Sequence, residues 1–159
     1  MKAVIQRVRR AGVSSVPLGG DAAAPVVREI GHGLVVLAGF EKGDTDEDRR
    51  WMGAKVVALR IFEDDAGKMN RSVVEVGGSV LLVPNFTLAG DARKGRRPSF
   101  DNAMAPELAS PQFDLLAAEV AAAGVRVETG VFRATMLVSI ENDGPITMIL
   151  DSRAGVRGE

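Results

Sequence analysis

The sequence Asn142-Asp143-Gly144-Pro145-Ile146-Thr147 separates two runs that alternate as β-strands do, residues 135–140 and 146–150. Pro145 has no amide hydrogen and Gly144 has no side chain, so the chain can turn here and direct bare backbone carbonyl groups at a ligand. Such a turn can recognise the shape of a ligand without side chains. The alternative is a hairpin turn with no further role.

A second informative stretch lies upstream and reads Val83-Pro84-Asn85-Phe86-Thr87-Leu88. Thr87 carries a hydroxyl group, but no base stands near it in the sequence, and such a hydroxyl is a poor nucleophile at neutral pH. We therefore expect Thr87 to bind a substrate by hydrogen bonding rather than to attack it.

A basic run follows, with Arg93, Lys94, Arg96 and Arg97 around Gly95. The formal net charge is -1, so the chain lacks the strongly basic balance of many nucleic-acid-binding proteins. Any contact with RNA must then be local, and this run is the candidate. The alternative is a solvated surface loop.

The inventory of catalytic side chains is short. The chain has one histidine and no cysteine, which excludes disulfides and thiolate nucleophiles. His32 stands between Gly31 and Gly33, which predicts a turn residue rather than a catalytic base. Asp64-Asp65 beside Gly67 indicates a polar turn, so we expect neither a metal site nor a cofactor.

The composition fits one domain. The chain has 159 residues, of which 46% are hydrophobic and 26% charged, and no apolar run approaches the roughly 20 residues that would span a bilayer. We expect a domain over residues 1–151, a disordered tail over residues 152–159, and no membrane segment. The first residues alternate as a strand does and show no leader, from which we expect a cytoplasmic protein.

The pattern of apolar residues predicts a strand-rich α/β fold with two main helices. Thr45 is the expected N-cap of the first helix, whose apolar stripe contains Met52, Val56 and Leu59. The second helix falls between Pro106 and Ala123; Pro111 either starts it or kinks it, and Gly124 ends it. Residues 14–25 are expected to form a mobile, exposed loop. The predicted strands are residues 2–13, 26–30, 33–40, 60–62, 79–83, 125–127, 135–140 and 146–150.

The two stretches together resemble the D-aminoacyl-tRNA deacylase family. Further matches are spread over most of the chain: Gln6-Arg7-Val8, Gly31, Gly33, Arg60-Ile61-Phe62, Gly67-Lys68-Met69-Asn70, Gly77-Gly78-Ser79-Val80, Arg97-Pro98-Ser99-Phe100, Gly130, Phe132 and Met136. The resemblance implies β/β/α layering, a homodimer, and hydrolysis of the ester of D-aminoacyl-tRNA, with glycyl-tRNA as a further substrate.

The resemblance also implies roles for individual residues. The Gly144-Pro145 bond would be cis, would enter the partner subunit's pocket as a chiral filter against L-amino acids, and would be braced by Arg7. Asn85-Phe86-Thr87 would offer backbone N–H and polar groups to the ester and the terminal adenosine, and Met136 would line the adenosine region. The ester is labile, so oriented N–H groups and exclusion of wrong poses would be enough for catalysis.

One departure from the family pattern affects the pocket. Typical members carry Ser-Gln where this chain has Pro84-Asn85, so a backbone donor is lost and the amide side chain is one methylene shorter. A second function therefore remains open, that of a sister deacylase with relaxed chirality that clears mischarged L-aminoacyl-tRNA. The near-neutral charge and the lack of a general base suggest a third, a non-catalytic RNA-binding dimer, against which the intact Gly144-Pro145 and Phe86-Thr87 argue.

Overall fold

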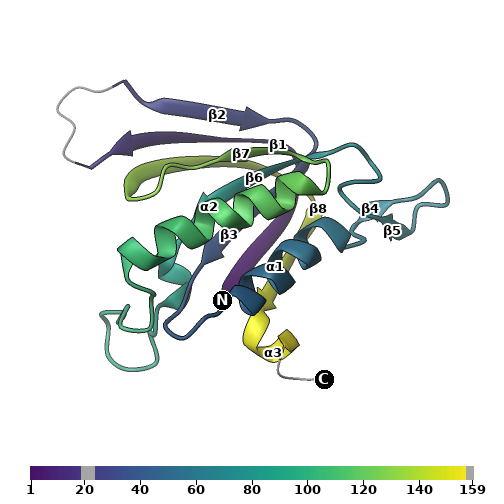
Figure 1. The fold of residues 1–159 in the computed structure, drawn as a ribbon. Helices are drawn as coiled ribbons and strands as arrows, with labels where there is room; N and C mark the ends of the chain where they lie inside the picture. Colours follow the sequence, from purple (N-terminus) through teal and green to yellow (C-terminus); the bar gives the residue numbers. More distant parts are fainter. Residues whose placement is uncertain (19–23, 157–159) are drawn as a thin grey trace.

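The computed structural model describes residues 1–18 and 24–156. Its secondary structure is strand-rich, with three α-helices and a short 3-10 helix (Figure 1). The elements in chain order are β1 (Lys2–Pro17), β2 (Val26–Ile30), β3 (Gly33–Gly39), α1 (Asp46–Ala58), β4 (Phe62–Glu63), β5 (Met69–Arg71), β6 (Ser79–Pro84), η1 (Phe86–Ala89), α2 (Pro106–Ala122), β7 (Arg126–Thr129), β8 (Ala134–Asp151) and α3 (Ser152–Val156).

The main sheet has six strands and is organised around β1. β8 runs antiparallel along the whole length of one edge of β1, from Lys2 opposite Asp151 to Pro17 opposite Ala134. β2 and β3 pair with successive parts of the other edge. β6 then adds in parallel to β3, and β7 in parallel to β6. The sheet curls until it is nearly closed, and α1 and α2 cover one of its faces (Figure 1).

The two faces of the sheet carry separate cores. Alternate residues of β3 and β6 point to opposite faces, as the twofold period of a strand requires. Leu34, Val36 and Leu82 face α1 and α2, where they pack with Met52, Phe113 and Leu116. The other core lies inside the curl of the sheet and contains Val8, Ala11, Val13, Ile30, Val35, Leu81 and Val83. β3 is thus buried on both faces, as its nearly all-apolar sequence predicts.

The two long helices form where the sequence predicts them. Thr45 is the N-cap of α1, and its hydroxyl and the Asp48 carboxylate form a reciprocal capping box. α2 starts at Pro106, and Pro111 lies inside it, which settles the boundary that the sequence left open. Gly124 follows α2 with a φ of 84°, a conformation that favours glycine and ends the helix.

Four predictions need correction. β1 continues through Pro17, because β8 pairs with it that far, so residues 14–17 of the expected loop 14–25 belong to a strand; residues 19–23 of that loop lie outside the described part. The runs 135–140 and 146–150 belong to one strand, β8, and Gly144-Pro145 lies within it instead of in a hairpin turn. Residues 152–156 of the expected disordered tail form α3, a third helix, and residues 157–159 of that tail lie outside the described part.

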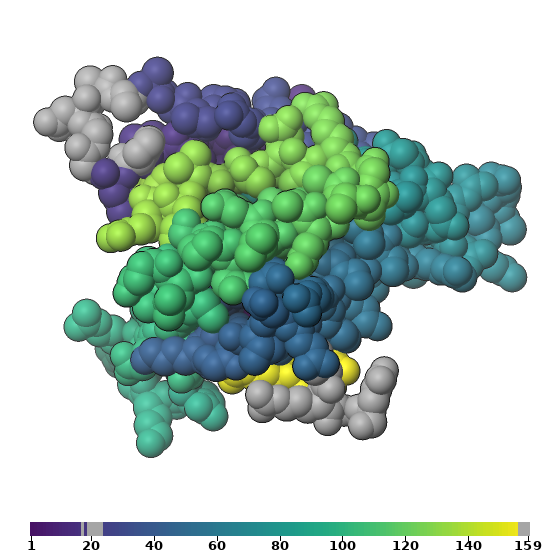
Figure 2. Space-filling view, viewed as in Figure 1, coloured from purple at the N-terminus to yellow at the C-terminus, as the bar shows by residue number. Residues whose placement is uncertain are grey.

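The surface shows two projecting segments. The β4–β5 hairpin extends from one end of the molecule, and the basic loop between η1 and α2 extends from the other (Figures 1 and 2). Within residues 1–18 and 24–156, no helix is both long and apolar enough to cross a membrane.

A buried polar network joins α3 to the start of α1. The Met1 ammonium group donates to Asp44 Oδ1 at 2.7 Å and to Ser152 Oγ at 2.6 Å, and Ser152 Oγ donates to Asp48 Oδ1 at 2.6 Å. Burial alone would raise the pKa of Asp48, but the hydrogen bonds from Ser152 and Thr45 outweigh it and lower that pKa to about 2. These hydrogen bonds hold Ser152, the first residue of α3, against the start of α1.

This network predicts acid sensitivity. Because the pKa of Asp48 is lower in the folded chain, its ionised form stabilises the fold above about pH 4, and that contribution, about 2 kcal/mol, is lost as the pH falls toward 2. Asp48→Asn should therefore lower the free energy of unfolding at pH 7 and flatten its decline between pH 4 and 2, as measured by urea denaturation. Asp65→Asn, at a side chain that is 93% exposed, is the matched control and should change little. Parallel pH profiles for wild type and Asp48→Asn would contradict this account.

Candidate functional site

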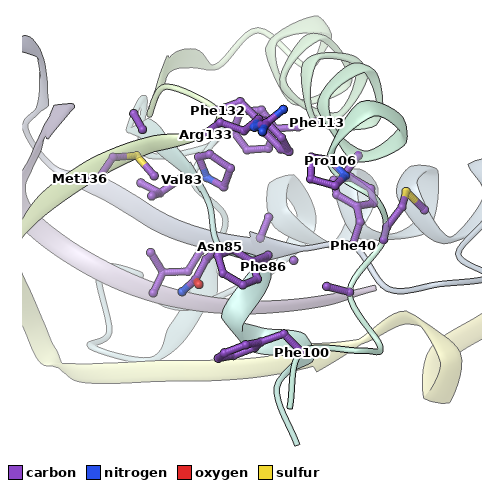
Figure 3. Close-up of a pocket in the computed structure, with 18 of the residues that line it drawn as sticks. Phe40, Val83, Asn85, Phe86, Phe100, Pro106, Phe113, Phe132, Arg133 and Met136 are labelled. Carbon is purple, nitrogen blue, oxygen red and sulfur yellow. The ribbon is translucent and has the colours of Figure 1, made fainter. Parts of the chain in front are cut away.

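A pocket of about 700 Å³ opens where β3 and β6 end. Its walls come from these strand ends, the start of α2, the turn before β8 and the first half of β8 (Figure 3). The side chains are almost all apolar or aromatic, with Asn85 and Arg133 as the exceptions among the described residues. The lining residues are Leu18, Leu37, Ala38, Gly39, Phe40, Val83, Pro84, Asn85, Phe86, Phe100, Ala103, Met104, Ala105, Pro106, Ala109, Phe113, Phe132, Arg133, Ala134, Met136, Val138 and Ile140.

Asn85 and Phe86, at the start of the turn Asn85-Phe86-Thr87, form one wall of this pocket. Asn85 caps η1: its Oδ1 accepts hydrogen bonds from the Thr87 amide at 3.2 Å and from the Thr87 hydroxyl. The backbone of Gly39 lies close beneath, since a Cβ atom there would be 2.6 Å from the Asn85 carbonyl oxygen. The Asn85 side chain thus holds the turn in shape, and Thr87 is turned toward Asn85 instead of toward a base.

Aromatic rings cover both ends of the pocket. Phe86 is 58% exposed and meets Phe100 edge to face, with centroids 5.2 Å apart. Phe132 packs against Phe113 of α2 with centroids 6.3 Å apart. Figure 3 shows Phe86 and Phe100 on one side of the cavity and Phe132 on the other, with Met136 near Val83. Such a pocket suits a flat ring system that can stack on aromatic side chains, such as a nucleobase.

Gly144 and Pro145 lie on a bulge of β8. Gln6 pairs with Thr147 and Val8 pairs with Asn142, so residues 143–146 stand opposite the single residue Arg7. The Gly144-Pro145 bond is cis, and Gly144 has a φ of 118°. The side-chain amide of Asn142 closes the bulge by donating to the backbone oxygens of Arg7 at 2.9 Å and Ile146 at 3.0 Å.

Arg7 anchors the bulge from the neighbouring strand. Its side chain is buried, donates to the Ile61 carbonyl oxygen at 2.9 Å, and places Nε 3.2 Å from Asp143 Oδ2. The exposed Arg9 also pairs with Asp143, at 3.1 Å. Asp143, the residue just before Gly144, is therefore held between the guanidinium groups of Arg7 and Arg9.

The basic part of the loop between η1 and α2, residues 93–97, does not line the pocket. It is flanked by Asp91 and Ser99, which are joined by backbone hydrogen bonds. Arg93 makes a bidentate contact with Asp91, which holds the pKa of that carboxyl well below its usual range. Lys94, Arg96 and Arg97 are exposed and make no ion pair within the described residues. The charge available to an anionic partner is thus that of Lys94, Arg96 and Arg97.

The structure brings only some of the predicted site residues together. Asn85, Phe86 and Met136 line the pocket, and Thr87 is bonded to Asn85 beside it. Gly144, Pro145 and Arg7 do not line this pocket. His32 lies in the connection between β2 and β3, where its ring meets Phe62, and is likewise not part of the pocket wall.

Sequence reasoning missed three residues of the site region. The sequence assigned no role of their own to Asn142 and Asp143, which precede Gly144. Asn and Asp side chains before a glycine often accept or donate hydrogen bonds with the nearby backbone, so this pair could have been predicted to shape the turn. Arg133 was not singled out at all. No pattern in the sequence marks it, because its place at the pocket follows from the turn between β7 and β8.

Comparison with known proteins shows to which family the chain belongs. The family model described as D-Tyr-tRNA(Tyr) deacylase matches residues 4–151. Proteins named D-aminoacyl-tRNA deacylase from Thermoanaerobacter pseudethanolicus and Kosmotoga olearia are 50% and 52% identical to this chain, and each match covers 96% of this chain and 98% of the relative.

Two solved structures share the fold. One, named c-Myc DNA Unwinding Element Binding Protein, has a TM-score of 0.83 and 37% identity, over 95% of this chain and 98% of its own. The other, described as a probable eukaryotic D-amino acid tRNA deacylase, has a TM-score of 0.76 at 20% identity, over 94% and 97%, and supports the fold alone. With a family model that matches nearly the whole sequence and relatives of about half identity over the same length, the chain belongs to the D-Tyr-tRNA(Tyr) deacylase family.

Proposed function

We propose that this protein hydrolyses the ester bond of D-aminoacyl-tRNA and releases the D-amino acid and free tRNA. The observation that carries the proposal is the apolar pocket closed by the Asn85-capped turn, in a chain about half identical to proteins named for this activity. The pocket can hold a terminal nucleoside, and the ester would lie at the turn. A labile ester needs oriented N–H groups and a positioned water more than a strong nucleophile.

In this proposal, catalysis depends on how the protein positions the substrate ester and the attacking water. No histidine or cysteine lies among the described lining residues, and the Thr87 hydroxyl donates to Asn85. The backbone N–H groups of the turn would stabilise the developing oxyanion, while the pocket walls exclude unproductive poses. The vicinal ribose hydroxyl of the substrate would assist or orient the attacking water.

The chiral filter requires a second copy of the chain. Gly144 and Pro145 are exposed on their bulge and do not line the pocket of their own chain, so they can act in a pocket only across an interface. β8 also exposes large apolar side chains: Ile149 is 77% exposed and Leu137 is 73% exposed. A homodimer would cover such a face. A monomer with full activity at micromolar concentration would contradict this part of the proposal.

Steric exclusion explains the expected substrate range. Backbone carbonyls at the amino-acid site would occupy the space that an L side chain needs, so discrimination would arise from a clash with the wrong substrate. Glycine has no side chain to exclude, and glycyl-tRNA would be cleaved as well. The tRNA backbone would be contacted by the basic side chains of Arg93, Lys94, Arg96 and Arg97. The contact made by Arg93 would be the weaker one, because its guanidinium group is already paired with Asp91.

Pro84-Asn85 favours a second candidate, a deacylase that clears mischarged L-aminoacyl-tRNA. Pro84 lines the pocket and cannot donate a backbone hydrogen bond there. A third candidate, a nucleic-acid-binding protein without turnover, is suggested by the structural neighbour of 37% identity, which is named for DNA binding. The substrate experiment below distinguishes all three.

The first prediction concerns chirality. One tRNA charged in parallel with a D-amino acid, its L enantiomer and glycine should lose the D and glycyl groups at least roughly 100-fold faster than the L group, which corresponds to a clash of about 3 kcal/mol. Gly144→Ala should slow D-hydrolysis, because a Cβ atom would lie 2.8 Å from Ile146 Cγ1 and displace the bulge. Equal cleavage of D and L would favour the second candidate, and no cleavage the third.

The second prediction concerns Thr87. Thr87→Ala should reduce kcat by roughly tenfold, far less than the loss of about 10⁶-fold that removal of a true nucleophile can cause. Thr87→Ser keeps the hydroxyl that bonds Asn85 and is the control that should retain most activity. Single-turnover hydrolysis of D-aminoacyl-tRNA measures both variants. A fall to the uncatalysed rate, or a trapped acyl-threonine, would show that Thr87 attacks the ester.

A further inference from the structure

Arg133 has an unusual backbone conformation. Its φ is 56°, and it is the one non-glycine residue of the described ranges with a positive φ. This left-handed conformation is unfavourable for a residue with a side chain, and such residues concentrate at functional sites. Arg133 therefore calls for an explanation other than the stability of its turn.

Arg133 is also the one charged side chain among the described residues that line the pocket. It is exposed, and it makes no ion pair or side-chain hydrogen bond with any other residue that the structure describes. Figure 3 shows it beside Phe132, on the side of the cavity away from Phe100. An unpaired guanidinium group at the rim of an apolar pocket can bind an anion of the molecule inside it.

We propose that Arg133 binds the phosphate on the 5′ side of the terminal adenosine of the bound tRNA. This inference rests on the proposed function, because it takes the terminal nucleoside as the occupant of the pocket. The RNA strand must leave through the mouth of the pocket, so the phosphate next to the terminal nucleoside passes the rim. That phosphate is the nearest permanent anion to the ester in every aminoacyl-tRNA.

The geometry of arginine suits this role. A guanidinium group presents parallel N–H donors that match two phosphate oxygens, which an ammonium group cannot do. The acidic side chain of a D-aspartyl or D-glutamyl group is the other possible anion. It would be present in few substrates, whereas the phosphate is common to all of them.

The test compares adenosine with adenosine 5′-monophosphate (AMP), which differ by this phosphate. Isothermal titration calorimetry of the full-length protein should show that AMP binds about tenfold more tightly than adenosine, as expected for one charge-assisted contact. Arg133→Gly should reduce this preference to within about twofold, since glycine tolerates a φ of 56° and removes the guanidinium group with little backbone cost. Arg133→Lys should retain part of the preference.

Arg50→Ala is the matched control, because Arg50 is an arginine of α1 that is 68% exposed and does not line the pocket. It removes the same charge and should leave the preference for AMP unchanged. With D-aminoacyl-tRNA, Arg133→Gly should raise KM about tenfold with little change in kcat.

Three results would overturn the inference. They are an equal affinity of the wild type for AMP and adenosine, a preference that survives Arg133→Gly, and an effect of Arg133→Gly confined to tRNA charged with acidic amino acids. Failure of the wild type to hydrolyse any aminoacyl-tRNA would instead contradict the proposed function, so the two failures can be told apart.

Discussion

The pairing of β1 with β8 is the constraint on which the rest of the structure depends. Two register shifts interrupt it, one between Gln6 and Val8 and the other between Val8 and Arg10. The second places an extra residue in β1, so the odd-numbered residues of this strand change from one face of the sheet to the other. Ala3 and Ile5 face the helices, whereas Ala11 and Val13 face the interior of the curl. One strand therefore serves two cores, and the sheet can curl.

The first shift forms the bulge that carries Gly144 and Pro145. Arg7 stands opposite this bulge, and its buried guanidinium group ties Asp143 to the carbonyl group of Ile61, three residues beyond the end of α1. The conformation of the bulge is thus coupled to the segment that follows α1, and not only to its own strand. A rigid backbone feature of this kind is what exclusion of a substrate by shape requires.

Much of the fold could be predicted from the sequence, because the signals are local. Thr45 followed by acids marks the start of α1, and the apolar run of β3 indicates burial on both faces. The continuity of β8 could not be predicted, since Gly144-Pro145 is typical of a turn and only the partner strand shows that pairing resumes beyond it. The position of Ser152 likewise depends on Asp48 and Met1, which are remote in sequence. The candidate site was predictable to a similar degree. Asn85, Phe86 and Met136 meet in the pocket, as predicted. Arg133 could not be predicted, because its backbone conformation is visible only in three dimensions.

The central claim is that Gly144-Pro145 of one subunit completes the pocket of another, and mixed dimers test it most directly. Subunits carrying Phe86→Ala and subunits carrying Gly144→Ala, each impaired alone, are refolded together and assayed with D-aminoacyl-tRNA. If the residues act across the interface, one pocket of each heterodimer has both intact, and activity should return to about a quarter of the wild-type value. Mixed dimers that remain as inactive as their parents would show that both act within one chain, and would contradict the account.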